Sequence, residues 1–201
     1  MYLTPEMAAE VLVEAYRYSR QCDKIKIKTL DMDHLLAGHS FTIGGHPVHF
    51  RLLTRHDIDL WTKFVNGCSS RSLWLRFLSP FRATPENAQR FCNINLDKEV
   101  AIVAEMIEDN QKKLIAVARL IKCPPHNEAE YAVIVTDSWQ QKRLGRVLSE
   151  MCLNLAKNLN IRIVNAETVQ ENFPIIKVLD HCRFKIKNKE RNMILMSLTL
   201  K

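Results

Sequence analysis

The order of apolar and polar residues along the chain predicts a mixed α+β fold. Strands rich in Val, Ile and Ala are predicted over 100–106, 114–121 and 130–136, and the polar link between the first two is typical of a hairpin. A helix is predicted over 141–158, because apolar residues recur there at helical spacing. Further helices are predicted over 57–66, 69–77, 85–94 and 174–181, and further strands over 161–166, 184–186 and 193–200. Mostly antiparallel strands followed by alternating strands and helices indicate a twisted, mixed sheet flanked by helices.

The pattern separates an N-terminal extension from a single core domain. Thr4-Pro5-Glu6 is typical of a helix start, and apolar residues follow it on one helical face. Lys24–Lys28 alternates lysine with isoleucine, as a half-exposed strand does. Gly44-Gly45 then divides two apolar stretches, which favours a hairpin. We therefore expect a helical and extended segment over 1–40, docked on the core or on another copy, and one domain over 41–201.

Composition places the chain among ordinary globular proteins. It has 201 residues, of which 47% are hydrophobic and 25% are charged. No apolar run reaches the roughly 18 residues that a membrane span requires, and glutamates in the first turns do not fit a signal peptide. A cytoplasmic protein without a membrane partner is therefore expected. The six cysteines are widely spaced and form no Cys-x-x-Cys pair, so reduced, mostly buried thiols are predicted.

The net charge of +7 raises the question of an anionic partner. Lysines and arginines are scattered, aromatic residues make up only 7% of the chain, and no nucleic-acid-binding motif is present. Nucleic acid is therefore not an expected partner. An anionic cofactor such as coenzyme A would use some of this charge, and an ordinary basic surface explains it more simply.

The most informative stretch is 127–148, where a predicted strand runs directly into a turn and the start of the long helix. Successive backbone N–H groups at a helix start form a cradle for phosphate, and the helix dipole adds to it. The turn contains Gly145, and Lys142, Arg143 and Arg146 add positive charge there. Such a pattern alone is common, since neither the P-loop pattern GxxxxGK(S/T) nor the dinucleotide pattern GxGxxG is present.

The turn resembles a known cofactor loop. Trp139–Gly145 (WQQKRLG) is similar to the acyl-coenzyme A pyrophosphate loop of GNAT acetyltransferases, Q/R-x-x-G-x-G/A. Gln140 occupies the first position of that pattern and Gly145 the last, whereas Arg143 replaces the middle glycine. This departure places the backbone angles of the loop in question, although any residue except proline supplies the amide donors.

Further segments strengthen the resemblance. Glu171-Asn172, with Phe184 twelve residues after the asparagine, is similar to the family segment E-N-x-x…L-G-F. Residues 69–77 (SSRSLWLRF), 100–105 (VAIVAE) and 130–133 (EYAV) are similar to a subgroup exemplified by bacterial protein-lysine acetyltransferases. The resemblance extends over roughly residues 48–200.

The resemblance implies the GNAT fold and an N-acetyltransferase that uses acetyl-coenzyme A. It implies that Glu130 is the catalytic general base, which takes a proton from the acceptor amine. Many family members protonate the leaving thiolate with a tyrosine seven residues after the asparagine, a position that Leu179 occupies here. The resemblance further implies cofactor contacts by Val133, Ile134, Val135, Gln140, Gln141, Lys142, Arg143, Gly145, Arg146 and Asn172.

The motifs leave the amine acceptor open. The subgroup resemblance favours a protein lysine, and a small amine such as a polyamine or an amino sugar is the second hypothesis. The third is a non-catalytic acyl-coenzyme A-binding module, because the middle glycine and the tyrosine are both replaced. Whether the protein forms a homo-oligomer is also left open by the motifs.

Other candidate residues carry weaker signals. His46 and His49 are accompanied by no HExxH or Cys-x-x-Cys pattern, so no metal site is expected. Cys123 has no nearby partner for nucleophilic chemistry, and the three tryptophans are interpreted as packing residues. Arg76 is interpreted either as a buried or interfacial arginine or as a residue that shapes the acceptor site.

Overall fold

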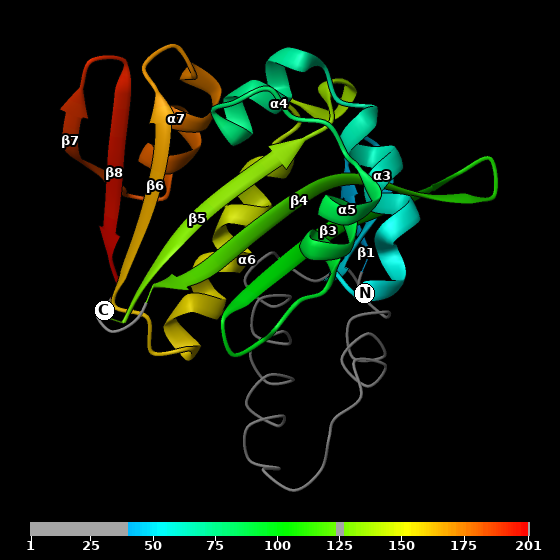
Figure 1. The fold of residues 1–201 in the computed structure, drawn as a ribbon, viewed down its shortest axis with the longest axis horizontal. Coiled ribbons are helices and arrows are strands. Elements are labelled where there is room, and N and C mark those ends of the chain that lie inside the picture. The colour runs from blue at the N-terminus through cyan, green and yellow to red at the C-terminus, as the bar shows by residue number, and fades with distance from the viewer. Residues whose placement is uncertain (1–39, 124–126, 201) are drawn as a thin grey trace, which may run out of the picture.

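The computed structural model describes residues 40–123 and 127–200 (Figure 1). The helix and strand predicted between Thr4 and Lys28 lie outside these residues. The first described strand begins at Ser40, close to the start predicted for the core domain.

The described residues form an eight-stranded sheet in the order β1-β2-β3-β4-β5-β6-β8-β7 (Figure 1). All neighbouring strands are antiparallel except β5 and β6, which are parallel. The strands are β1 (Ser40–Ile43), β2 (His46–Leu52), β3 (Glu99–Glu108), β4 (Gln111–Cys123), β5 (Glu128–Val135), β6 (Ile163–Val169), β7 (Lys185–Glu190) and β8 (Met193–Thr199).

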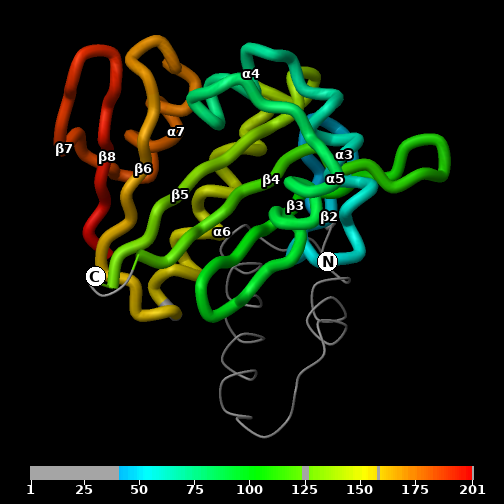
Figure 2. The backbone as a smooth tube through the Cα atoms, in the orientation of Figure 1, coloured from blue at the N-terminus to red at the C-terminus, as the bar shows by residue number. Residues whose placement is uncertain are grey.

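Helices cover both faces of the sheet (Figure 2). Successive residues of each strand point to opposite sides, so apolar residues on each face pack against the helices on that side. On one face, Tyr131 of β5 packs in the core against α6, and its hydroxyl lies 2.7 Å from the Ser149 hydroxyl. On the other face, Ile134 packs with the residues of α3, α4 and α5. The helices are α3 (Ile58–Asn66), α4 (Ser70–Phe77), α5 (Pro85–Cys92), α6 (Leu144–Asn158) and α7 (Phe173–His181), with 3-10 turns η1 (Arg55–Asp57) and η2 (Asp137–Trp139).

Strands β5 and β6 separate soon after they begin. They pair at only three positions, and the last pair is Glu130 with Asn165. Beyond it the residues Tyr131–Val135 pair with β4 alone, so the β5 edge that faces β6 has no strand partner among the described residues. The parting strands leave room between them that α4 and α7 flank (Figure 1).

The predicted α+β class and the mixed, mostly antiparallel sheet are confirmed, with element ends shifted by a few residues. Thr84 caps α5, since its hydroxyl accepts a hydrogen bond from the Asn87 N–H. One prediction was wrong in a way that matters for the site. The long helix was predicted from Gln141, but α6 begins at Leu144, because Gln141 and Arg143 adopt left-handed backbone angles.

Candidate active site

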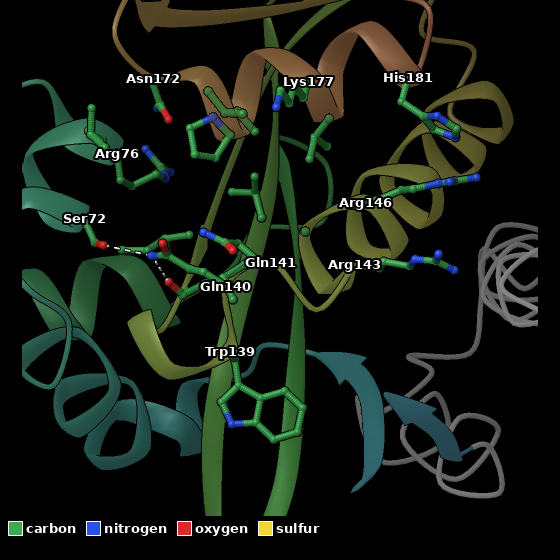
Figure 3. A pocket seen from close by; sticks show the side chains of 18 residues that line it. Ser72, Arg76, Trp139, Gln140, Gln141, Arg143, Arg146, Asn172, Lys177 and His181 are labelled. Carbon is green, nitrogen blue, oxygen red and sulfur yellow. Dashed lines mark hydrogen bonds between the residues drawn. The ribbon is translucent and has the colours of Figure 1, made fainter. Parts of the chain in front are cut away.

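A pocket of about 500 Å³ with mainly apolar walls opens where β5 and β6 part (Figure 3). Its walls come from α4, the end of β5, the loop after η2, the first turn of α6, and α7. Nine of the residues predicted to contact a cofactor line it: Val133, Ile134, Val135, Gln140, Gln141, Arg143, Gly145, Arg146 and Asn172. The fold therefore brings together the loop, the strand and the asparagine that lie far apart in the sequence.

The loop before α6 presents a run of backbone donors. Gln141 has φ 61° and Arg143 has φ 65° and ψ −1°, so the arginine adopts the conformation that a glycine would favour in its place. For a residue with a side chain this conformation costs roughly 1 kcal/mol. Within the described ranges no acceptor is found for the N–H groups of residues 141–146. Unpaired amides at a helix start attract an anion.

A hydrogen-bonded cluster joins the loop to α4. The Asp137 carboxylate accepts bonds from the Ser69 N–H (2.8 Å), the Ser69 hydroxyl (2.6 Å) and the Ser72 hydroxyl (2.8 Å). The Gln140 side chain donates to the Ser72 hydroxyl (2.9 Å) and to the Val135 carbonyl (3.1 Å). The Gln140 side chain is therefore engaged within the protein, where it fixes the loop against β5 and α4.

The cluster also sets the ionisation of Asp137. Partial burial by itself would raise the pKa of this carboxyl, but the hydrogen bonds from Ser69 and Ser72 outweigh that effect and lower it. A carboxyl whose pKa is lower in the folded state stabilises the fold above its unfolded pKa, and this contribution is lost as the pH falls through the folded pKa.

Replacing Asp137 with Asn is expected to destabilise the fold by about 1 kcal/mol at pH 7, because one acceptor and the charge are lost from an exposed cluster. The affinity of the loop for an anionic ligand should fall a few-fold as the loop loosens. Urea unfolding should show the difference from wild type shrinking as the pH falls below the ordinary pKa of aspartate. Asp97→Asn is the control, since Asp97 is also exposed and its carboxylate forms no hydrogen bond with the described residues. An equal effect of both variants would contradict the role of the cluster.

Asn172, which directly precedes α7, supplies a polar atom to the pocket wall that α7 forms. It is buried, and its Nδ2 donates to the Thr168 hydroxyl at 3.0 Å. In the described part of the chain no donor is found for its Oδ1. The main-chain edge of Tyr131–Val135 lies across the same gap, and apart from the Val135 carbonyl, which accepts from Gln140, no partner for it is found among the described residues. Together they offer acceptors and donors to an extended molecule with amide groups.

Two predicted site residues have side chains outside the pocket lining. The Lys142 ammonium lies 4.8 Å from the centre of the Trp139 ring, and its chain lies over Gly44 in the β1–β2 turn. Glu130 is exposed at the point where β5 and β6 separate, on the sheet face that α4 covers. It lies near enough to Arg76 to influence its ionisation.

The residue pattern did not predict that α7, or residues of α4 other than Arg76, line the pocket. Ser72, Leu75 and Arg76 share one face of α4. On α7 the lining residues are Pro174, Ile175, Lys177, Val178 and His181. Residues three and four positions apart on a predicted helix were the available signal. Trp139 lines the pocket and is buried at its base, which confirms its interpretation as a packing residue.

The remaining candidate residues are the cysteines and the possible metal ligands. Of the cysteines that the structure describes, Cys68, Cys92 and Cys152 are buried and free, and burial raises the pKa of each thiol to about 12. Cys123 is free and exposed. Across residues 40–123 and 127–200 no group of three His, Cys, Asp or Glu is placed to hold a metal ion. No helix in this part of the chain is long and apolar enough to cross a membrane.

The parted strands, the amide-lined loop at the start of α6 and the pocket between them define an acyl-coenzyme A-binding type of fold. The model of the acetyltransferase (GNAT) domain matches residues 51–197. The chain therefore belongs to the GNAT acetyltransferase family, a class of acyltransferases.

Known proteins agree with this assignment. An acetyltransferase of Pseudomonas aeruginosa is 26% identical over 119 residues, which are 59% of this chain and 64% of the relative. The chain thus spans less than two thirds of the length of that curated relative. The GNAT domain of PAT from S. lividans has a TM-score of 0.72 at 23% identity and covers 80% of this chain and 96% of that one. Spermidine N-acetyltransferase from Vibrio cholerae, solved with CoA and spermine, has a TM-score of 0.62 at 21% identity, with coverages of 76% and 95%. These structural likenesses show the fold.

Proposed function

We propose that the protein transfers an acetyl group from acetyl-coenzyme A to a primary amine. The observation that carries this proposal is the run of N–H groups over residues 141–146 at the mouth of a pocket between parted strands. The pyrophosphate of coenzyme A would bind these amides, with positive charge from Arg143 and Arg146 nearby. The residues fit the rest of the cofactor as well. The free edge of β5 and the Asn172 Oδ1 would pair with the amides of the pantetheine arm.

The proposed reaction needs few groups from the protein. The thioester supplies an activated carbonyl carbon, a new N–C bond forms to the amine, and the C–S bond breaks. An ammonium has no lone pair, so a base must first take its proton, and we assign this role to Glu130, acting directly or through water. Glu130 is the last β5 residue paired with β6, and this position at the point where the strands part supports the assignment. Leu179, the family position of the acid, is fully buried in the core, so water protonates the thiolate.

We propose a protein lysine as the acceptor, on the resemblance of the α4 and β5 segments to the protein-lysine subgroup. Arg76 of α4 and Lys177 of α7 both line the pocket (Figure 3), and a lysine presented on a protein surface would enter between these two helices. A small amine is the competing acceptor. Free-thiol release measured with lysine peptides and with spermidine separates the two, and a clear excess for spermidine would overturn the lysine proposal.

Acetyl-coenzyme A is expected to raise the melting temperature of the protein. At a concentration 100 times its Kd a ligand stabilises the fold by about 2.7 kcal/mol, which is roughly 5–10 °C for a chain of this size. Pantetheine, which lacks the pyrophosphate, is the control and should give a much smaller shift. An unchanged melting temperature with acetyl-coenzyme A would contradict the site assignment.

Buried Leu179 occupies the position at which many family members carry the tyrosine that protonates the thiolate. This favours one competing function, a binding module without turnover. Tight binding of acetyl-coenzyme A, with no thiol release from any amine, is the result that would establish it.

A further inference from the structure

Arg76 differs from the other partly buried arginines of the structure. Arg51 bonds to the carboxylates of Asp57 and Glu105, at 2.7 Å each. Arg119 pairs with Glu99. Arg76 lines the pocket, and within the described ranges it forms no ion pair. Its guanidinium lies 4.9 Å from the centre of the neighbouring Phe77 ring, and no acceptor for its N–H groups is found among the residues that the structure describes.

The position of Arg76 is unfavourable for an unpaired cation. Burial, with a smaller contribution from repulsion by Arg119, lowers the pKa of its guanidinium to about 10, while Glu130 and Tyr131 oppose the change. With this pKa the side chain still carries its charge near neutral pH. The guanidinium is surrounded by protein yet keeps some exposed surface, because it faces the pocket. A fixed positive charge with five donors against apolar walls is a binding site for a planar anion.

Arg76 lies on a different wall of the pocket from the amide loop before α6. Arg143 and Arg146 lie on one side of the pocket, at the start of α6, and Arg76 extends from α4 on the opposite side (Figure 3). The electrostatic neighbours of Arg76 are Arg119, Glu130 and Tyr131, and of these Glu130 stands at the end of the gap where the strands part. That end is where the proposed function places the acceptor amine.

We infer that Arg76 selects acceptors that carry a carboxylate close to the reacting amine. This inference rests on the proposed function and extends it to the acceptor. The amine would face the carboxylate of Glu130, and the acceptor carboxylate would bind the guanidinium of Arg76, so the charges of site and acceptor match. A second positive charge on the acceptor, as in a polyamine, would instead meet Arg76 and be repelled. The carboxylate belongs either to an acidic residue beside a lysine in a protein or to a free amino acid.

The test compares matched acceptors in wild type and in Arg76→Gln. One pair is a lysine peptide with Glu or with Gln next to the lysine, and the other is Nα-acetyl-lysine with a free or an amidated carboxyl. Wild type should prefer the carboxylate form by about 10- to 100-fold in kcat/KM, which is the preference that one charge-assisted hydrogen bond produces. The pair with the larger preference identifies which source of carboxylate is used. Arg76→Gln should bring the ratio close to one, and Arg76→Lys should keep part of it.

Controls separate recognition from folding. Arg71→Gln changes an exposed arginine of α4 outside the pocket lining and should keep the preference. Arg76→Gln should keep the acetyl-coenzyme A melting shift, which shows that its fold and cofactor site are intact. Titration of the same peptides into the CoA-bound protein gives the preference as a ratio of Kd values, independently of turnover.

A wild-type ratio near one in both assays overturns the inference, as does a ratio that Arg76→Gln preserves. Preference for spermidine overturns it as well. An Arg76-dependent preference for a succinyl over an acetyl thioester would place the carboxylate on the donor and also overturn it. These results leave the proposed function intact when acetyl-coenzyme A binds and amines are acetylated. No melting shift with acetyl-coenzyme A overturns the proposed function itself, and the inference with it.

Discussion

Replacing Glu130 with Gln is expected to lower kcat by about 100-fold or more while leaving the KM for acetyl-coenzyme A unchanged. General-base catalysis contributes on this scale, and the amide keeps the size of the side chain but cannot accept the amine proton. The Glu130 side chain lies outside the pocket lining, so cofactor binding should not depend on it. Steady-state free-thiol release, with both substrates varied, measures the two constants separately.

Glu128 offers a matched control for this experiment. It lies two residues earlier on β5, on the same face of the sheet, and accepts a hydrogen bond of 2.8 Å from the Asn165 side chain. Glu128→Gln should therefore keep kcat within a few-fold. An unchanged kcat in Glu130→Gln would remove the base assignment. In that event Glu167→Gln should be measured, because Glu167 is exposed on the same face of β6, two residues beyond the partner of Glu130.

Replacing Gly145 with Glu is expected to weaken acetyl-coenzyme A binding by about 100-fold or more. The new carboxylate would lie beside the amides that we propose bind the pyrophosphate, and two like charges about 5 Å apart repel by roughly 3 kcal/mol at an effective dielectric constant of about 20. The fold should survive, since a Cβ at Gly145 would meet only the Val135 side chain at 3.7 Å. A glutamate in the first turn of α6 would also interact favourably with the helix dipole, which stabilises the fold.

Two further variants separate charge from size at this position. Gly145→Gln has nearly the same volume without the charge and should lose much less affinity. Gly145→Ala should bind nearly as wild type. Calorimetric titration with acetyl-coenzyme A measures all three, and equal affinities for the Glu and Gln variants would contradict an anion site at the start of α6.

Local patterns predicted much of the lining of the pocket. Gln140, Arg143 and Gly145 are close in the sequence, and a loop between a strand and a helix start presents its amides whatever its side chains are. For that reason the loop keeps its form with Arg143 in place of glycine, at the cost of a left-handed arginine. The same local signals put the helix start three residues too early, because a propensity for helix does not reveal left-handed angles at Gln141 and Arg143.

Side-chain direction was the part that sequence patterns did not supply. Gln140 bonds to Ser72, 68 residues earlier in the chain, and Lys142 turns toward Trp139 instead of the pocket. Both outcomes depend on where α4 and the β1–β2 turn pack against the loop. The spacing of Ser72 and Arg76 marks one face of a helix but does not say what that face meets.

The fold class, the position of the amide loop and the family could be predicted from the residue pattern, because periodicity and the chemistry of a helix start are encoded within short stretches of chain. That α4 and α7 line one pocket beside the parted strands, and that Arg76 lines it with no carboxylate partner among the described residues, became apparent only from the packed structure. Ion pairing, burial and strand separation are properties of surfaces brought together from distant segments. They are settled by packing across the sheet.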